Sequence, residues 1–173
     1  MGSIIVRLVL ILLPPALLAT LALLLAAPPI VGALQPPVEQ PIAFPHPQHV
    51  QLAQLDCQFC HRMAAVSAEA GLPAVEQCVM CHQVVRQDSP EVQKLIQAWN
   101  SQQPIEWNRI HRVPDTVRFE HEAHIKAGID CTVCHGPVQE MTQVKQVRPL
   151  NMGDCINCHR ERSAPSDCTV CHK

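Results

Sequence analysis

The chain has 173 residues, a formal net charge of −2 and 47% hydrophobic content, yet only 3% of its residues are aromatic. A slightly acidic chain whose sequence contains no run of basic residues is not expected to bind nucleic acid. The apolar residues are concentrated at the N-terminal end. The remaining chain is therefore too poor in large apolar side chains to build a conventional aliphatic core.

The N-terminal segment is predicted to be a membrane anchor. Residues 8–34 carry no charged side chain, and this length can cross a bilayer as a helix. Proline pairs at 14–15 and 28–29 would kink or shorten that helix. A cleaved secretory signal is the alternative, because Val31-Gly32-Ala33 resembles a small-residue cleavage site. The apolar run exceeds the usual signal length, which favours a retained transmembrane helix over residues 1–34.

The single cation before the apolar run predicts the orientation of the chain. Arg7 should stay on the cytoplasmic side, so the rest of the chain should lie outside. We therefore expect a single-pass protein of the bacterial inner membrane, with a cytoplasmic N-terminus and a periplasmic domain. Residues 35–47 contain five prolines and are interpreted as an extended spacer.

All ten cysteines belong to five copies of the pattern C-x-x-C-H, which is the attachment signature of c-type haem. Two cysteines three residues apart share one face of a helical turn, so both thiols can form thioethers with one porphyrin. The histidine that follows supplies one axial nitrogen to the iron. The cofactor-binding cysteines are Cys57, Cys60, Cys78, Cys81, Cys131, Cys134, Cys155, Cys158, Cys168 and Cys171, and the proximal histidines are His61, His82, His135, His159 and His172.

Two other uses of paired cysteines explain the pattern less well. Structural zinc takes two pairs per ion and would leave one pair over. A disulfide framework is possible in an oxidising compartment, but it gives no reason for a histidine after every second cysteine. The sequence therefore predicts five covalently attached haem c groups.

A second pattern, F-x-H-x-x-H, precedes the first and the third haem motifs. It begins at Phe44, thirteen residues before Cys57, and again at Phe119, twelve residues before Cys131. The chain is thus an internal repeat, with a two-haem half up to about residue 100 and a three-haem half from about residue 111. Histidines three apart on a helical turn face the same side and could reach two neighbouring irons.

Short helices are expected around these motifs. One is predicted over residues 62–70, closed by Gly71, and another from Ser89 to about Asn100. The second carries an apolar stripe, which is expected to pack on a haem edge or on a partner. An aspartate stands directly before four of the motifs, where it would cap a helix: Asp56, Asp130, Asp154 and Asp167.

The number of remaining histidines equals the number of haems. Five irons with two axial ligands each need five distal ligands, and five histidines lie outside the motifs: His46, His49, His111, His121 and His124. Met141 or Met152 could replace one of them, which would raise the potential of that haem.

The F-x-H-x-x-H and C-x-x-C-H arrangement resembles the class III multihaem cytochromes, which are small proteins with closely packed bis-histidine haems. The resemblance implies a mostly irregular, small α domain dominated by haem over residues 48–173. It also implies that His46 serves the Cys57/Cys60 haem, that His121 serves the Cys131/Cys134 haem, and that the second histidine of each pair serves a different haem. With an N-terminal anchor and the segment 105–114, the chain is similar to the pentahaem subunits of bacterial alternative complex III.

These resemblances imply an electron-transfer subunit rather than an enzyme in its own right. It would carry electrons from a quinol-oxidising membrane complex to a periplasmic cytochrome c or copper protein. The implied partners are an iron–sulfur/molybdopterin-like subunit and quinol-binding membrane subunits. The alternative is a membrane-anchored multihaem quinol dehydrogenase that feeds a periplasmic reductase. A multihaem reductase with an open iron fits less well, because five spare histidines are present.

Overall fold

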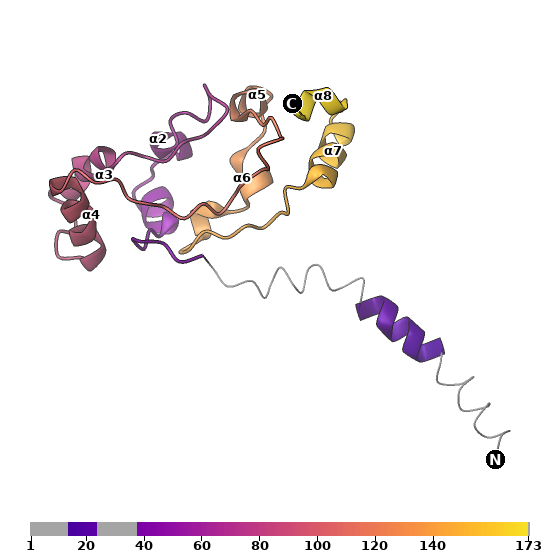
Figure 1. Ribbon diagram of the computed structural model, residues 1–173. Coiled ribbons are helices and arrows are strands. Elements are labelled where there is room, and N and C mark those ends of the chain that lie inside the picture. The colour runs from indigo at the N-terminus through magenta and orange to yellow at the C-terminus, as the bar shows by residue number, and fades with distance from the viewer. Residues whose placement is uncertain (1–13, 24–37, 173) are drawn as a thin grey trace, which may run out of the picture. The chain divides into compact units, whose positions relative to one another are not determined.

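The computed structural model of the chain describes residues 14–23 and 38–172 and divides into two units, 1–36 and 37–173 (Figure 1). In the first unit, residues 14–23 are helical and exposed. The predicted anchor over residues 1–34 lies largely outside the described residues. Within the part that is described, no helix is both long enough and apolar enough to cross a membrane.

The second unit consists of short helices joined by irregular segments, as predicted. Every C-x-x-C-H motif lies on a helix: α2, α3, α6, α7 and α8. In chain order the elements are the π-helical turn η1 (Gln48–Leu52), α2 (Cys57–Cys60), α3 (Val75–His82), α4 (Pro90–Asn100), α5 (His121–Lys126), α6 (Cys131–His135), the 3₁₀ turn η2 (Val138–Glu140), α7 (Met152–Glu161) and α8 (Cys168–Cys171).

The predicted aspartate caps are confirmed at two motifs. Asp56 caps α2 by accepting from the backbone N–H of Gln58, and Asp130 caps α6 by accepting from that of Thr132. Asp167 occupies the cap position of α8 without a side-chain capping bond. The prediction was wrong for Asp154, because α7 begins earlier in the chain, at Met152, with Asn151 as its cap.

The helix predicted over residues 62–70 is absent, and this segment forms turns instead. Two contacts explain why. The imidazole Nδ1 of His61 donates to the carbonyl of Gly71 at 2.7 Å, which folds the segment back on itself. The carbonyls of Ser67 and Ala68 accept hydrogen bonds from the backbone of α5, so they are turned away from a helical ladder.

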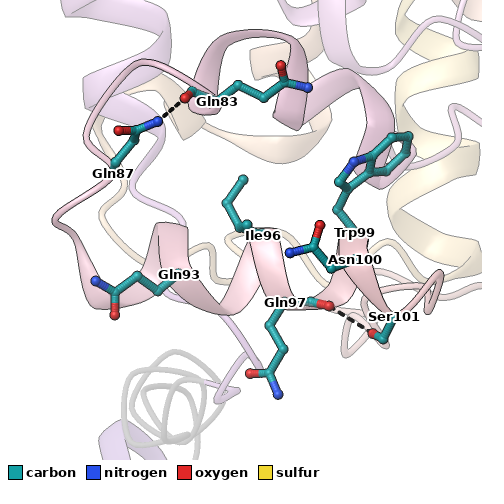
Figure 2. A pocket seen from close by; sticks show the side chains of 8 residues that line it. All are labelled: Gln83, Gln87, Gln93, Ile96, Gln97, Trp99, Asn100 and Ser101. Carbon is teal, nitrogen blue, oxygen red and sulfur yellow. Dashed lines mark hydrogen bonds between the residues drawn. The ribbon is translucent and has the colours of Figure 1, made fainter.

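The second predicted helix is confirmed as α4, with Ser89 at its cap position and Pro90 at its first turn. Its stripe is only partly covered. Val92 and Leu95 are buried, and α4 packs against α3, whereas Trp99 remains 41% exposed. An open groove of about 920 Å³ lies beside α4 (Figure 2).

Residues 39–46 are attached to the haem domain, which differs from the spacer interpretation. The side chain of Gln40 makes two hydrogen bonds with the backbone of Asn108, its Nε2 donating to the Asn108 carbonyl and its Oε1 accepting from the Asn108 N–H. The backbone N–H of Ala43 donates to Glu91 on α4 at 2.6 Å. The backbone N–H of His46 donates to the Met141 carbonyl at 3.2 Å.

The protein part of the domain has almost no apolar interior. Among the described residues, the buried apolar side chains are Ala64, Val79, Val92, Leu95 and Met141. Many large apolar side chains are exposed instead, including Leu52, Met80 and Val84, which are 61–82% exposed. A chain of this composition needs other apolar groups to cover these side chains, as expected for a domain built around porphyrins.

Candidate haem sites

The ten cysteine thiols are free, and each motif places two of them on one helical turn. They are exposed or half-buried, so both sulfurs of a pair can be reached from outside the polypeptide. Burial raises the pKa of several thiols, including Cys60, Cys78 and Cys134, and so keeps them protonated. Free thiols paired in this way fit thioether attachment, and they do not form the disulfide framework considered above.

The backbone fixes the tautomer of most of the predicted ligand imidazoles. A carbonyl oxygen can only accept, so an Nδ1 beside it carries the proton and leaves the Nε2 lone pair free for a metal. Six histidines donate Nδ1–H to a carbonyl in this way: His49 to Pro45, His61 to Gly71, His82 to Val85, His121 to Ala68, His124 to Glu120 and His159 to Pro165.

The second histidine of each F-x-H-x-x-H pattern faces the proximal histidine of the second C-x-x-C-H motif that follows the pattern. The ring centroids of His49 and His82 are 6.0 Å apart, and those of His124 and His159 are also 6.0 Å apart. Two imidazoles on opposite sides of one metal ion, each bonded at about 2 Å, have centroids about 6 Å apart. The repeat therefore places both pairs at the spacing of two axial ligands.

The first histidine of each pattern lies beside the motif that follows it. His121 and His135 have parallel rings with centroids 6.3 Å apart. His61 is one of the two histidines whose proximity adds to the lowering of the pKa of His46. Burial and then the neighbouring histidines lower the pKa of both His46 and His135 to about 4. These rings are consequently neutral at pH 7, as a metal ligand must be.

Two buried ring nitrogens have no hydrogen-bond partner, His46 Nδ1 and His111 Nε2. A buried polar atom without a partner is unfavourable and rare in folded proteins. A bond from Nε2 to iron would remove this cost at His111. The orphaned Nε2 of His111, the free thiols and the imidazole pairs together fit covalently bound haem.

His111 differs from the other predicted distal ligands in its geometry relative to a proximal histidine. Its ring is perpendicular to that of His135, with centroids 4.5 Å apart, which is too short for ligands on opposite sides of one iron. Burial lowers the pKa of His111. The methionines considered as substitutes also differ from each other, because Met141 is buried and Met152 is 65% exposed on the first turn of α7.

Each pair of distal histidines is held by the phenylalanine of its own pattern. Phe44 stacks on His49 with centroids 4.2 Å apart and meets His46 edge-on at 4.9 Å. Phe119 repeats this geometry, stacking on His124 at 4.6 Å and meeting His121 edge-on at 4.8 Å. The repeated F-x-H-x-x-H spacing identified these phenylalanines in the sequence, but only the fold shows that they orient the imidazoles.

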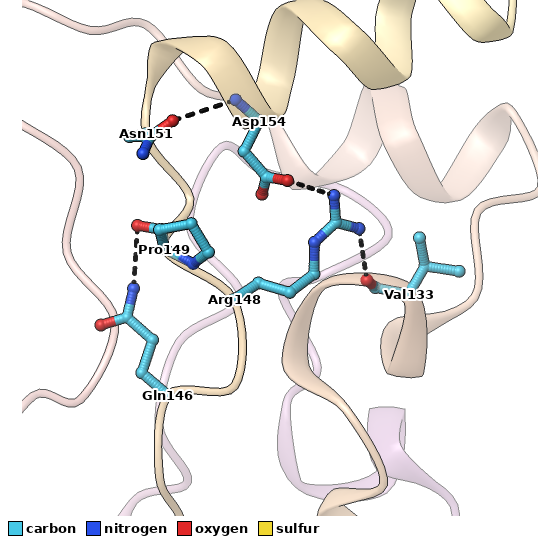
Figure 3. Close-up of polar contacts among 6 residues, drawn as sticks. All are labelled: Val133, Gln146, Arg148, Pro149, Asn151 and Asp154. Carbon is cyan, nitrogen blue, oxygen red and sulfur yellow. Dashed lines mark hydrogen bonds and ion pairs between the residues drawn. The ribbon is translucent and has the colours of Figure 1, made fainter. Parts of the chain in front are cut away.

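Arg148 joins the third and fourth motifs, and nothing in the sequence pattern pointed to it (Figure 3). One guanidinium nitrogen donates to the carbonyl of Val133 on α6 at 2.8 Å, and the other donates to the Asp154 carboxylate on α7 at 2.5 Å. The ion pair with Asp154 raises the pKa of Arg148. Asp154 thus pairs with Arg148 in the segment before α7 instead of capping its own helix.

Replacing Arg148 with glutamine should lower the free energy of unfolding of the holo-protein by about 1–2 kcal/mol, because a partly buried charge-assisted bond and a backbone contact are both lost. Urea unfolding followed by Soret absorbance measures this. Arg160→Gln, an exposed change on α7, is the matched control. A double variant with Asp154→Asn should be little less stable than Arg148→Gln, and full additivity of the two changes would contradict the pairing.

Comparisons with known proteins agree with this geometry. The family model for class III cytochrome c matches residues 30–112, and the model for cytochrome c7 and related cytochrome c matches residues 117–173. A curated relative is the multihaem cytochrome c subunit of menaquinone reductase from Nitratidesulfovibrio vulgaris (strain Hildenborough). It is 28% identical over 162 residues, which cover 78% of this chain and 77% of the relative. The two family matches meet between the two halves of the internal repeat.

Proposed function

We propose that this multihaem cytochrome c, class III in type, is the electron-transfer subunit of a membrane-bound complex that reacts with quinol. The family matches imply covalently bound c-type haem and a role in electron transfer. The proposal extends this to five haems, one on each C-x-x-C-H motif. When bound, the haems supply reversible one-electron transfer, while the chain holds and insulates them.

The observation that carries the proposal is the repeated 6.0 Å spacing between a distal and a proximal imidazole. In the proposed ligand set, His46 and His61 hold the first iron, His49 and His82 the second, His121 and His135 the third, and His124 and His159 the fourth. Two strong nitrogen ligands keep the same coordination geometry in both oxidation states. They also leave no open position for a small substrate, which suits a carrier of electrons rather than an enzyme.

The proposed setting is a respiratory complex in the bacterial inner membrane. The N-terminal segment would anchor the chain with Arg7 in the cytoplasm, and the haem domain would lie in the periplasm. A relative that is a subunit of menaquinone reductase supports membrane-complex partners that react with a quinone. We propose quinol-binding membrane subunits and an iron–sulfur/molybdopterin-like subunit as these partners. A periplasmic cytochrome c or copper protein would accept the electrons, as in alternative complex III.

The rival function, a quinol dehydrogenase that feeds a periplasmic reductase, would require this chain to oxidise quinol itself. Quinol oxidation releases two protons, so the site needs a proton acceptor. The groove beside α4 is lined by Gln83, Gln87 and Gln97, with Ile96 and Trp99, and no imidazole or carboxylate lines it (Figure 2). This lining favours a quinol site on another subunit.

Mass spectrometry of the purified protein tests the haem count. We expect the polypeptide to carry the mass of five haems after acid–acetone extraction, because thioether bonds survive that treatment. A variant with Cys168→Ala and Cys171→Ala should lose one haem mass and serves as the calibration. Haem extracted by the acid, or fewer than five retained groups in the unmodified chain, would contradict the proposal.

Isolation of the complex from native membranes tests the partners. Quinone-reactive membrane subunits should co-purify with this chain, and the isolated chain should be reduced slowly by a quinol analogue. Rapid reduction of the isolated chain would support the rival function instead.

A further inference from the structure

We infer that the haem attachment motifs follow one another in space in the order second, first, third, fourth, fifth, so that the second and fifth motifs form the two ends of the row. This order differs from the order in the sequence, where the first motif would be an end. The inference rests on the proposed function, because it concerns the path between the haems that the motifs hold.

The second motif neighbours the first. On α3, the side chain of Gln77 donates to the carbonyl of Phe59 inside the first motif. The thiol of Cys60 is near enough to Cys78 to contribute to the raised pKa of the Cys78 thiol. The second motif is also in contact with α4, because α3 packs against that helix.

The first motif is also the one that contacts the second half of the chain. Carbonyls in the turn segment that follows it accept from the backbone of α5, Ser67 from Glu122 at 3.1 Å and Ala68 from His121 at 3.1 Å. The Nδ1 of His121 donates to the same Ala68 carbonyl at 2.7 Å. The segment after the first motif thus orients the imidazole that faces His135 of the third motif. The first and third motifs are therefore joined through the carbonyls of Ser67 and Ala68, although more than seventy positions separate the two motifs in the sequence.

Contacts within the second half extend the row in sequence order. Arg148 bridges Val133 of the third motif and Asp154 beside the fourth motif (Figure 3). His159 of the fourth motif donates Nδ1–H to the carbonyl of Pro165, at 2.5 Å, in the segment that leads into the fifth motif.

The arrangement of the helices agrees with this order. Figure 1 shows α3 and α4 at one end of the second unit, α7 and α8 at the other end, and α2 and α6 between them. The consequence is that an electron delivered beside α4 passes the first motif before it reaches any motif of the second half. The first motif, rather than the second, is therefore the obligatory connection between the halves.

The test delivers electrons at one end and blocks the row at chosen positions. Gln87→Cys introduces a cysteine at an exposed position beyond α3, and a ruthenium photosensitiser is attached to its thiol. The ten native cysteines are all expected to be bound to haem in the holo-protein, so the label reacts at position 87 alone. His46→Ala, His121→Ala or His124→Ala opens one iron, carbon monoxide then holds that haem ferrous, and the other four haems are oxidised. Illumination in the presence of a sacrificial electron donor then reduces the oxidised haems, and Soret absorbance gives the number of haems that are reduced in the fast phase.

The order predicts a different count for each variant. Blocking the first site with His46→Ala should leave one rapidly reduced haem, blocking the third with His121→Ala should leave two, and blocking the fourth with His124→Ala should leave three. More than one rapidly reduced haem in the His46→Ala variant would overturn the order. A variant that binds no carbon monoxide would instead show that its histidine is not the ligand, which is a failure of the proposed function.

A second set of variants does not depend on the distal ligands. Cys57→Ala with Cys60→Ala removes the first haem, and Cys168→Ala with Cys171→Ala removes the fifth. With the photosensitiser at position 87, the first variant should show one rapidly reduced haem and the second should show four. Equal counts in the two variants would overturn the order, and mass spectrometry confirms beforehand that each variant retains four haems.

Discussion

Replacing His49 with alanine is expected to convert one low-spin haem into a high-spin haem that binds carbon monoxide. His49 stacks on Phe44 and donates Nδ1–H to the Pro45 carbonyl, so its Nε2 is held facing His82 with the ring centroids 6.0 Å apart. Alanine has no donor atom, and the iron would keep only the imidazole of His82. An iron with one axial ligand has an open position that carbon monoxide can fill.

The same result is expected for His124→Ala, at a different haem. His124 repeats the contacts of His49, with Phe119 stacked on it and His159 at 6.0 Å. The double variant should therefore bind two equivalents of carbon monoxide, because the two irons are separate. Titration of the dithionite-reduced proteins and EPR of the oxidised ones measure this.

Gln48→Ala, next to His49 on the same turn, is the matched control and should bind none. One equivalent in the double variant would mean that both histidines serve the same iron. No binding in either single variant would remove both residues from the ligand set.

The local features of this fold follow from short-range patterns. A cysteine pair three residues apart needs one helical turn, and each of the five motifs has one. The aspartates before Cys57 and Cys131 cap these turns through neighbouring backbone N–H groups, an interaction that depends on sequence distance alone. The recurrence of F-x-H-x-x-H likewise predicted an internal repeat, and the phenylalanine stacking is found in both halves.

The features that were predicted wrongly depend on contacts across the domain. Residues 62–70 have helix-forming composition, but their carbonyls serve α5 from the other half of the chain. Asp154 has the position of a cap, yet it pairs with Arg148, whose role depends on how α6 and α7 lie together. Residues 39–46 are rich in proline, but they are held by Asn108, Glu91 and Met141. Such tertiary contacts override local preference.

Replacing His111 is expected to leave one further iron with an open axial position, and we expect this to be the iron of the haem on the fifth motif. His135 already faces His121 at 6.3 Å with parallel rings, and the 4.5 Å perpendicular approach of His111 does not suit the opposite side of that iron. His111 Nε2 is nevertheless buried without a partner, and burial lowers the pKa of the ring, which keeps it neutral. His111 is thus a histidine able to bind a metal but not placed opposite His135.

The segment that follows His111 leads to the last motif. The backbone N–H of Arg118 donates to the Cys171 carbonyl at 2.7 Å, and Val117 forms an antiparallel bridge with His172. In the proposed ligand set, His172 is the proximal histidine that has no distal partner. These contacts keep residues 117–118 beside the fifth motif, six positions after His111 in the chain.

His111→Ala should therefore add one equivalent of carbon monoxide binding in the otherwise unmodified protein. It should add none when Cys168→Ala and Cys171→Ala have already removed the fifth haem. Arg112→Ala, the exposed neighbour in the same segment, controls for local disturbance and should bind none. Binding in both backgrounds would assign His111 to another iron. If the variant stays low-spin in the unmodified background, the sixth ligand is a methionine. Met152→Leu and Met141→Leu would then identify it, since a methionine-ligated haem has a higher potential that falls when the thioether is lost.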